Sequence, residues 1–349
     1  MSKNIVIFSD GTGQEGGIKF NTNVYKTFNL IEERSGKQIA HYSKGIGTDW
    51  RQITGSLLGV GMTDNMIECY QFLFDHFHVG DKIYLFGFSR GAATVRSLSR
   101  FIELFGILPK SRPELIKQAL KIYKIKNPHK RQQQASLFIA NNKNVECKIT
   151  FMGVWDTVAA MGLPNRFFDS MLSKIPPFKH KFHDFTISQN IEHAYHALSI
   201  DDTRAIFHPI LWKKKAHPQQ TVKQVWFSGV HTDVGGGYES EGLSNIPLVW
   251  MLNKALEHGL IIHDNIEINQ EISARMHNES IGISGRLFKQ KERVWNTDIE
   301  DKPTVHASVL ARQLNQHNET HPKYNPWILK NDYYLEPWNQ NIYQPKKAA

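Results

Sequence analysis

The chain has 349 residues, of which 40% are hydrophobic and 21% charged, as in a globular protein with a large buried core. Its formal net charge of +9 favours anionic partners such as phospholipid head groups or nucleic acid. The sequence has no run of about 18 apolar residues and no signal-peptide apolar region near its N-terminus. Cys69 and Cys147 form neither a CxxC motif nor a metal-ligand spacing. We therefore expect a cytoplasmic protein with reduced thiols and no transmembrane segment.

Strand-like and helix-like segments alternate along most of the chain. The patterns predict, in chain order, a strand before a glycine-rich turn (5–8), a helix (21–33), a strand within 38–49, a helix (63–77), a strand (81–89), a helix (92–105), a lysine-rich helical region (113–142), strands within 147–162 and 221–238, and a helix (245–259). This alternation predicts an α/β-hydrolase-like fold, with a mostly parallel sheet and helices on both faces. We expect residues 1–349 to form a single domain.

Two segments fit this alternation poorly. Residues 165–185 combine phenylalanines with two adjacent prolines and basic residues, and the end of the chain, 320–349, is rich in aromatic residues without a period. Such segments usually only pack against the rest of the domain and have no role of their own. The alternative is a lid or cap around 165–220 that covers an apolar pocket, followed by a C-terminal extension.

Ser89 lies in a motif that is typical of a nucleophilic serine. Gly87-Phe88-Ser89-Arg90-Gly91 matches G-x-S-x-G and stands between a predicted buried strand and a helix that begins with small residues. In this turn the flanking glycines allow close backbone approach, while the serine hydroxyl is exposed to a substrate. The alternative is a small residue in a tight turn without a chemical role.

A serine hydroxyl becomes an effective nucleophile when a base takes its proton and a carboxylate orients that base. The later predicted strands end at Asp156 and at His231 and Asp233, in the chain order Ser, Asp, His of α/β-hydrolases. This order predicts a Ser89–Asp156–His231 triad. A second pairing, Asp233 with His306, remains open, and Asp156 could instead only shape a turn.

An acyl transfer also needs N–H donors for the oxyanion. We expect the N–H of Arg90, which follows the nucleophile, and an N–H of Gly11 or Thr12 in the loop after the first strand. Asp10 would support this loop or hold His231. The side chain of Arg90 would form a salt bridge, or would meet an anionic head group.

Several motifs together resemble one known family. FSDGTG, TNVY, GFSRGAATVRSL, GVWDTVAAMG, HALSIDDTR and VWFSGVHTDVGGGY, between residues 4 and 260, are similar to a family formerly classed as a domain of unknown function. That family is now named for the catalytic domain of the type VI secretion phospholipase effector Tle1. The resemblance implies an α/β-hydrolase fold and hydrolysis of glycerophospholipid esters, with Ser89 as nucleophile, Asp156 as acid and His231 as base. It also makes export by a route without a signal peptide an alternative localisation.

Other functions receive less support. VIFSDGTG shares part of the phosphatase motif of haloacid dehalogenases, but Phe8 stands where their nucleophilic aspartate belongs. A metal-dependent hydrolase would use Asp10, His231 and Asp233 as ligands, and a non-catalytic interaction protein on a hydrolase scaffold is a further alternative. GTGQEGG (11–17) lacks the lysine of a phosphate-binding loop.

The basic stretch 117–131 fits a solvated helix face better than a nucleic-acid platform, so we expect no nucleic-acid partner. We expect an enzyme without cofactor or metal, acting on a lipid or small acyl ester and contacting an anionic membrane surface. The oligomeric state does not follow from the sequence.

Overall fold

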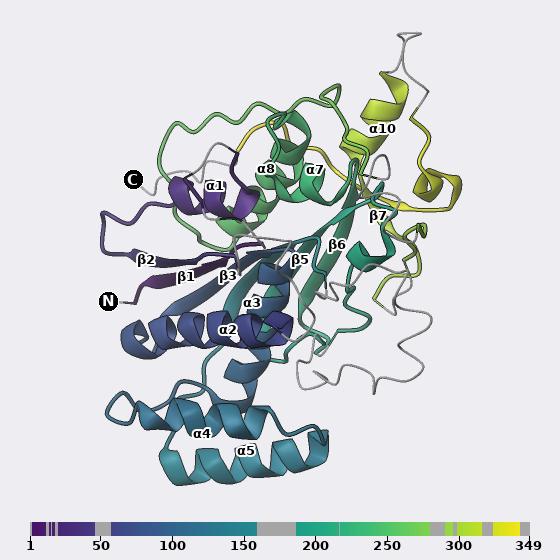
Figure 1. Ribbon diagram of the computed structural model, residues 1–349. Helices are drawn as coiled ribbons and strands as arrows, with labels where there is room; N and C mark the ends of the chain where they lie inside the picture. Colours follow the sequence, from purple (N-terminus) through teal and green to yellow (C-terminus); the bar gives the residue numbers. More distant parts are fainter. Residues whose placement is uncertain are drawn as a thin grey trace.

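Eight parallel strands form one sheet with the order β2-β1-β3-β4-β5-β6-β7-β8 (Figure 1). The strands are β1 (Asn4–Ser9), β2 (Gln38–Ser43), β3 (Lys82–Phe88), β4 (Ile149–Trp155), β5 (Ile191–Ser199), β6 (Thr221–Phe227), β7 (Thr304–His306) and β8 (Tyr334–Glu336). The computed structural model describes residues 2–11, 14, 16–17, 20–45, 57–158, 186–215, 217–279, 290–295, 299–315 and 324–342. This sheet confirms the predicted α/β class with a parallel sheet.

Helices cover both faces of the sheet. The helices are α1 (Asn23–Leu30), α2 (Leu57–His76), α3 (Arg90–Phe105), α4 (Glu114–Tyr123), α5 (Pro128–Asn142), α7 (His231–Gly235), α8 (Gly242–Glu257) and α10 (Ala307–Leu314), with 3-10 turns at Ala205–Phe207 and Trp327–Lys330. In Figure 1, α2 and α3 lie below the sheet, α1 and α8 lie above it, and α4 and α5 lie beyond α2 and α3. The central strands are therefore buried on both faces, which explains their nearly continuous apolar runs.

Strand β1 shows how the two cores divide. Ile5 and Ile7 pack with residues of α2 and α3, whereas Val6 and Phe8 pack with residues of α1 and α8. All four side chains are fully buried. Because side chains alternate along a strand, a run of apolar residues serves both cores at once.

The order of the strands reverses direction beside β1. The chain passes from β1 outward to β2 and then returns to form β3 on the other side of β1. Connections after β1 and β3 therefore leave in opposite directions, and in open α/β sheets ligands bind in the crevice at the carboxyl ends of two such strands. Gly11 lies in the loop after β1 and Ser89 directly follows β3, so both lie at this switch point of the sheet.

The structure corrects the sequence interpretation in two places. Residues 191–199 form strand β5 in the interior of the sheet, so they do not belong to the lid that was the alternative for 165–220. Two histidines and a glutamate interrupt the apolar pattern of this strand. Residues 165–185 lie outside the described residues. At the C-terminal end, β8 pairs with β7, so that part of the aromatic-rich extension continues the sheet. Both strands have three residues, too few for a periodic pattern.

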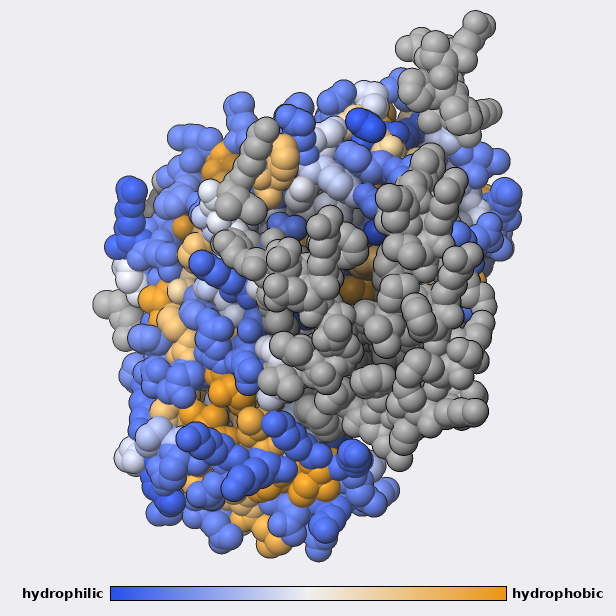
Figure 2. All heavy atoms as spheres, in the orientation of Figure 1, coloured by the Kyte–Doolittle hydropathy of each residue, from blue (hydrophilic) through white to orange (hydrophobic). Residues whose placement is uncertain are grey.

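Polar side chains cover much of the described surface in Figure 2, and a group of apolar side chains lies over the region of α4 and α5 at the bottom of the view. In α5, Leu137 is 54% exposed. Among the described helices, none combines the length and apolar character that a bilayer-spanning helix requires.

Candidate active site

Ser89 occupies the turn between β3 and α3, with a backbone φ of 58° and ψ of −121°. Such a left-handed conformation is strained for a residue with a side chain, and a close backbone approach holds it in place. A Cβ atom added to Gly91 would lie 2.0 Å from the carbonyl oxygen of Ser9, and one added to Gly87 would lie 2.6 Å from that of Gly91. The two glycines of the motif are therefore required by packing of the turn against β1 and α3.

His231 and Asp156 meet Ser89 at the carboxyl ends of the strands. His231 is the first residue of α7, shortly after β6, and Asp156 directly follows β4. The Ser89 Oγ atom lies 2.9 Å from Nε2 of His231, and Nδ1 of His231 lies 2.5 Å from Oδ2 of Asp156. The structure thus brings together the three side chains that the chain order singled out.

The charge on Asp156 decides which imidazole nitrogen carries the proton. The adjacent guanidinium of Arg293 and the hydrogen bond with His231 outweigh burial and hold the pKa of Asp156 far below its usual range. An ionised carboxylate only accepts, so Nδ1 of His231 carries a proton and donates it to Asp156. In the neutral ring Nε2 is then the acceptor for the Ser89 hydroxyl.

The backbone around both partners is shaped for this contact. Asp156 has a φ of 37°, in the left-handed region, and its Oδ1 accepts the N–H of Ser199 at 3.1 Å. The N–H of His231 donates to Oδ2 of Asp202 at 3.1 Å. Asp202 lies in the HALSIDDTR motif, which carried the family resemblance but was not assigned a role.

The Phe88 ring lies beside the histidine, with ring centroids 4.6 Å apart. A Cβ added to Gly235 would lie 2.0 Å from the Phe88 ring. The GGG turn after His231 therefore contributes a glycine that makes room for the ring of Phe88, the residue before Ser89.

The loop after β1 lies against Ser89. A Cβ added to Gly11 would lie 3.3 Å from Cβ of Ser89. However, the N–H of Gly11 donates to Oδ1 of Asp10 at 2.7 Å, so of the two expected donors in this loop Gly11 already has a hydrogen-bond partner. Thr12 lies outside the described residues.

Arg90, whose N–H belongs to the first turn of α3, is 6% exposed, and burial lowers the pKa of its guanidinium to about 10.

Asp10 holds the loop and does not contact His231. Its Oδ2 accepts the hydroxyls of Thr22 and Tyr42, both at 2.6 Å. Burial raises the pKa of Asp10 to about 6, although these hydrogen bonds oppose the shift. The loop-supporting alternative for Asp10 is therefore the one that fits its contacts.

The second proposed pairing, Asp233 with His306, does not form. Asp233 contacts His277 through Nδ1 at 2.7 Å, whereas Nδ1 of His306 lies 2.7 Å from the Ser308 hydroxyl. His306 is 1% exposed and stacks on Phe227. Its side chain accepts a backbone N–H at the start of α10, which is the role of a helix cap.

The three proposed metal ligands also have separate partners: Asp10 contacts Thr22 and Tyr42, His231 contacts Ser89 and Asp156, and Asp233 contacts His277. Within the described ranges, no three histidine, cysteine, aspartate or glutamate side chains are arranged to hold a metal ion. The observed donors therefore do not form the proposed site.

Arg293 is the site residue that sequence reasoning missed. It is 1% exposed and its Nη1 lies 2.6 Å from Oδ1 of Asp156. The segment around it, KQKERVW, has no motif or periodicity, and its charged residues resemble a solvated loop. The valine that follows it is 58% exposed, so the neighbouring residue gives no signal of its burial either.

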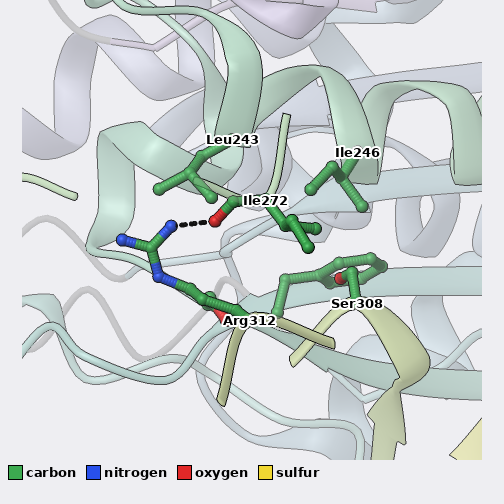
Figure 3. A pocket seen from close by; sticks show the side chains of 7 residues that line it. Leu243, Ile246, Ile272, Ser308 and Arg312 are labelled. Atoms are coloured by element: carbon green, nitrogen blue, oxygen red, sulfur yellow. Dashed lines mark hydrogen bonds between the residues drawn. The ribbon is translucent and has the colours of Figure 1, made fainter. Parts of the chain in front are cut away.

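A small hollow lies away from the triad (Figure 3). Its lining consists of Phe227, Ser228, Leu243, Ile246, Ile272, Ser308 and Arg312. Figure 3 shows Arg312 at one end, with a hydrogen bond to the Ile272 carbonyl, and Ile246 at the other. Because none of the triad residues lines it, we do not assign the acyl pocket to this hollow.

Comparison with known proteins agrees with the motifs. An uncharacterized protein of Saccharomyces cerevisiae is 31% identical over 230 residues, which make up 59% of this chain and 32% of the yeast protein. A crystal structure of an uncharacterized protein from Pseudomonas aeruginosa is 18% identical with a TM-score of 0.43, covering 75% of this chain and 46% of that one. The structure of the Tle1 effector bound to the VgrG spike of the type VI secretion system is also 18% identical, with a TM-score of 0.40, covering 69% of this chain and 52% of that one.

The chain thus spans about a third of the yeast protein and about half of each solved chain. The model of one family, described as the catalytic domain of Tle1-like type VI secretion phospholipase effectors, matches residues 3–254, a segment that contains Ser89, Asp156 and His231. The chain belongs to this family of Tle1-like phospholipase effector catalytic domains.

Proposed function

We propose that the chain is a serine hydrolase that cleaves carboxylic acyl esters of phospholipids, with Ser89 as nucleophile, His231 as base and Asp156 as acid. The observation that carries the proposal is the continuous hydrogen-bonded series from Ser89 Oγ to His231 Nε2, at 2.9 Å, and from His231 Nδ1 to Asp156 Oδ2, at 2.5 Å. Family membership supports an ester-hydrolysing enzyme of the lipase type.

The first half-reaction forms an acyl-enzyme. Ser89 Oγ attacks the ester carbonyl while its proton passes to Nε2 of His231. Asp156 stabilises the resulting imidazolium through the Nδ1 hydrogen bond. His231 then gives the proton to the departing alcohol oxygen, and the acyl group remains on Ser89. In the second half-reaction, water attacks the acyl carbon while one of its protons passes to Nε2 of His231. The bond between Ser89 Oγ and the acyl carbon then breaks, His231 returns the proton to Ser89 Oγ, and the fatty acid is released.

The tetrahedral intermediates need donors for the oxyanion. The N–H of Arg90 is one proposed donor, because it follows the nucleophile at the N-terminus of α3, where the helix dipole also favours negative charge. The second donor is proposed to come from the loop after β1. In that loop the Gly11 N–H is held by Asp10, so the proposal assigns the role to the amide of Thr12.

A phospholipid substrate is proposed on two grounds, the family to which the chain belongs and the net charge of +9. Positive charge attracts a peripheral protein to anionic membrane surfaces, and this attraction weakens as salt rises. The proposal therefore includes contact with an anionic lipid surface and faster turnover there than on zwitterionic vesicles.

The test is acyl release from a panel of phospholipids, presented as anionic and as zwitterionic vesicles, and from short p-nitrophenyl esters. We expect Ser89→Ala to lower turnover by about 10⁴-fold or more and to remain folded. We expect Ser97→Ala, which removes a buried hydroxyl from within α3, to retain activity. Labelling by a fluorophosphonate probe that Ser89→Ala abolishes and Ser97→Ala preserves would identify the nucleophile. A wild-type protein that is folded but neither releases acyl groups nor reacts with the probe would favour a non-catalytic scaffold.

A further inference from the structure

Arg293 forms a two-pronged ion pair with the proposed catalytic acid. Its Nη1 lies 2.6 Å from Oδ1 of Asp156 and its Nη2 lies 2.9 Å from Oδ2. Both side chains are completely buried. Arg293 also lies beyond the residues 3–254 that match the family model, so the matched segment alone does not contain this partner.

The rest of the guanidinium is held by backbone carbonyls. Nε donates to Asp202 at 2.9 Å, Nη1 to Ser199 at 2.8 Å and Nη2 to Phe207 at 2.7 Å. Together with the two bonds to Asp156, these contacts use all five N–H groups of the arginine. The segment itself is tied to the same region, because the N–H of Lys291 donates to Thr203 at 2.7 Å.

This arrangement leaves Asp156 with one orientation. Oδ1 accepts from Arg293 and from the N–H of Ser199, and Oδ2 accepts from Arg293 and His231. A planar guanidinium bound by five contacts therefore determines the plane of the carboxylate, and that plane directs Oδ2 at Nδ1 of His231. A lysine would supply charge but could not form the same fork.

The charge of Arg293 is as important as its shape. A buried carboxylate without a compensating cation takes up a proton, because burial disfavours its charged form. A protonated Asp156 would no longer stabilise the imidazolium that forms when Ser89 loses its proton. The guanidinium opposes this, in agreement with the low pKa of Asp156.

We infer that Arg293 is a positioning residue of the active site, which keeps Asp156 ionised and oriented toward His231. This inference rests on the proposed function, because it assigns Arg293 a role in a reaction carried out by Ser89. It predicts a catalytic effect that acts through Asp156 and that a purely structural arginine would not have.

The experiment compares Arg293→Gln and Arg293→Lys with the wild type, using kcat/KM on a p-nitrophenyl ester per active site titrated with fluorophosphonate, from pH 5 to pH 9. Removing the guanidinium allows Asp156 to take up a proton at higher pH and removes a cation near the imidazole. Both effects move the acidic limb of the profile to higher pH. We expect Arg293→Gln to lose about 10²-fold in kcat/KM and to move this limb by about one pH unit. Arg293→Lys keeps a positive charge beside Asp156, so the acidic limb of its pH profile should stay nearer the wild-type position. Its kcat/KM should still fall, because lysine cannot form the two-pronged ion pair with Asp156.

Two controls separate catalysis from folding. Arg96 is a second fully buried arginine, which donates to the carbonyl of Ile210 and stacks on Trp212 rather than on a triad residue. Arg96→Lys should lower stability and leave the pH limb unchanged. In the Asp156→Asn background, Arg293→Gln should cause less than about threefold further loss, because both substitutions act on the same carboxylate.

The outcomes distinguish the two proposals. Turnover that depends on Ser89 together with an unmoved acidic limb in both Arg293 variants, or a full additional loss in the Asp156→Asn background, would overturn the role of Arg293 alone. Wild-type turnover that persists in Ser89→Ala would overturn the proposed function and this inference together. If Arg293→Gln does not fold, the rate of Arg293→Lys per titrated site decides the question. A loss of rate that largely disappears in the Asp156→Asn background supports the role of Arg293, whereas an unchanged rate, or the same loss in that background, overturns it.

Discussion

The Nδ1 atom of His277 lies 2.7 Å from Oδ1 of Asp233 and forms a second histidine–aspartate pair beside α7. The other carboxylate oxygen, Oδ2, accepts the N–H groups of Val230 and His277 at 3.1 and 3.0 Å. Asp233 therefore supports the backbone that carries His231, two residues before it in α7.

Substituting Asp233 tests this supporting role. Asp233→Ala removes three hydrogen bonds at a buried position, so we expect a loss of about 2–4 kcal/mol in the free energy of unfolding. Activity per titrated site should fall by about 10- to 100-fold, much less than in His231→Ala, because His231 is displaced but still present. Urea unfolding and active-site titration measure the two effects. A folded Asp233→Ala protein as inactive as His231→Ala would place Asp233 in the reaction itself.

The base assignment is tested by comparing two histidines. His231→Ala should lower kcat/KM by about 10⁴-fold or more at unchanged fold. His306→Asn should retain activity, because His306 caps α10 and asparagine is also a good cap. Burial lowers the pKa of His306 to about 3, which disfavours a proton-accepting role near neutral pH. Steady-state measurement of kcat/KM for both variants tests this assignment. If His306→Asn loses far more kcat/KM than His231→Ala, His306 is the base.

Asp10 should make stability depend on pH in a defined direction. Its pKa is raised to about 6 in the folded chain, so between about pH 4 and pH 6 the folded state holds a proton that the unfolded state has lost. Stability from this group is fully present below pH 4 and is lost as pH rises through 6, by at most about 1.4 kcal/mol per pH unit. Asp10→Asn removes the titrating group and keeps the shape of the side chain.

Denaturant unfolding of the wild type and Asp10→Asn at pH 4, 5, 6 and 7 gives the measurement. The wild type should lose stability relative to the variant across this range. The second buried aspartate with a raised pKa, Asp201, is common to both proteins and cancels in the difference. A stability difference that stays constant from pH 4 to pH 7 would mean that Asp10 is ionised throughout.

Gly91→Ala tests whether the nucleophile turn depends on contact with β1. The added methyl would meet the Ser9 carbonyl at 2.0 Å, and backbone on both sides prevents easy relief. We expect a loss of about 3 kcal/mol or more in stability, together with a large loss of activity as Ser89 moves away from His231.

Gly36→Ala is the matched control, because that glycine has a φ of 69° but no atom within 4 Å of the added Cβ. It should cost about 1–2 kcal/mol from backbone strain alone and leave kcat/KM unchanged. Equal activity losses in the two variants would show that the turn does not depend on this close approach.

The sequence predicted the elements that carry Gly11 and Ser89 because their signals are local. The apolar run of Ile5 to Phe8, the G-x-S-x-G motif after Lys82–Phe88 and the small residues opening α3 are each recognisable within about ten residues. The parallel sheet follows from the alternation of these segments, since parallel strands need crossover connections. The order of Ser89, Asp156 and His231 along the chain likewise predicted these three side chains, with His306 left open as the alternative histidine.

Tertiary structure alone decided which polar groups are partners. Seventeen histidines are present, and only the geometry at the ends of β3, β4 and β6 shows that His231 meets both Ser89 and Asp156 while His306 caps a helix. The sequence pattern did not predict strand β5, because two histidines and a glutamate interrupt its apolar residues. In the structure this segment is a strand because it pairs with β4 on one side and β6 on the other. Arg293 lies 137 residues from Asp156 in the chain and in no motif. Its role arises from burial, which makes an isolated carboxylate costly and a bidentate cation beside it necessary.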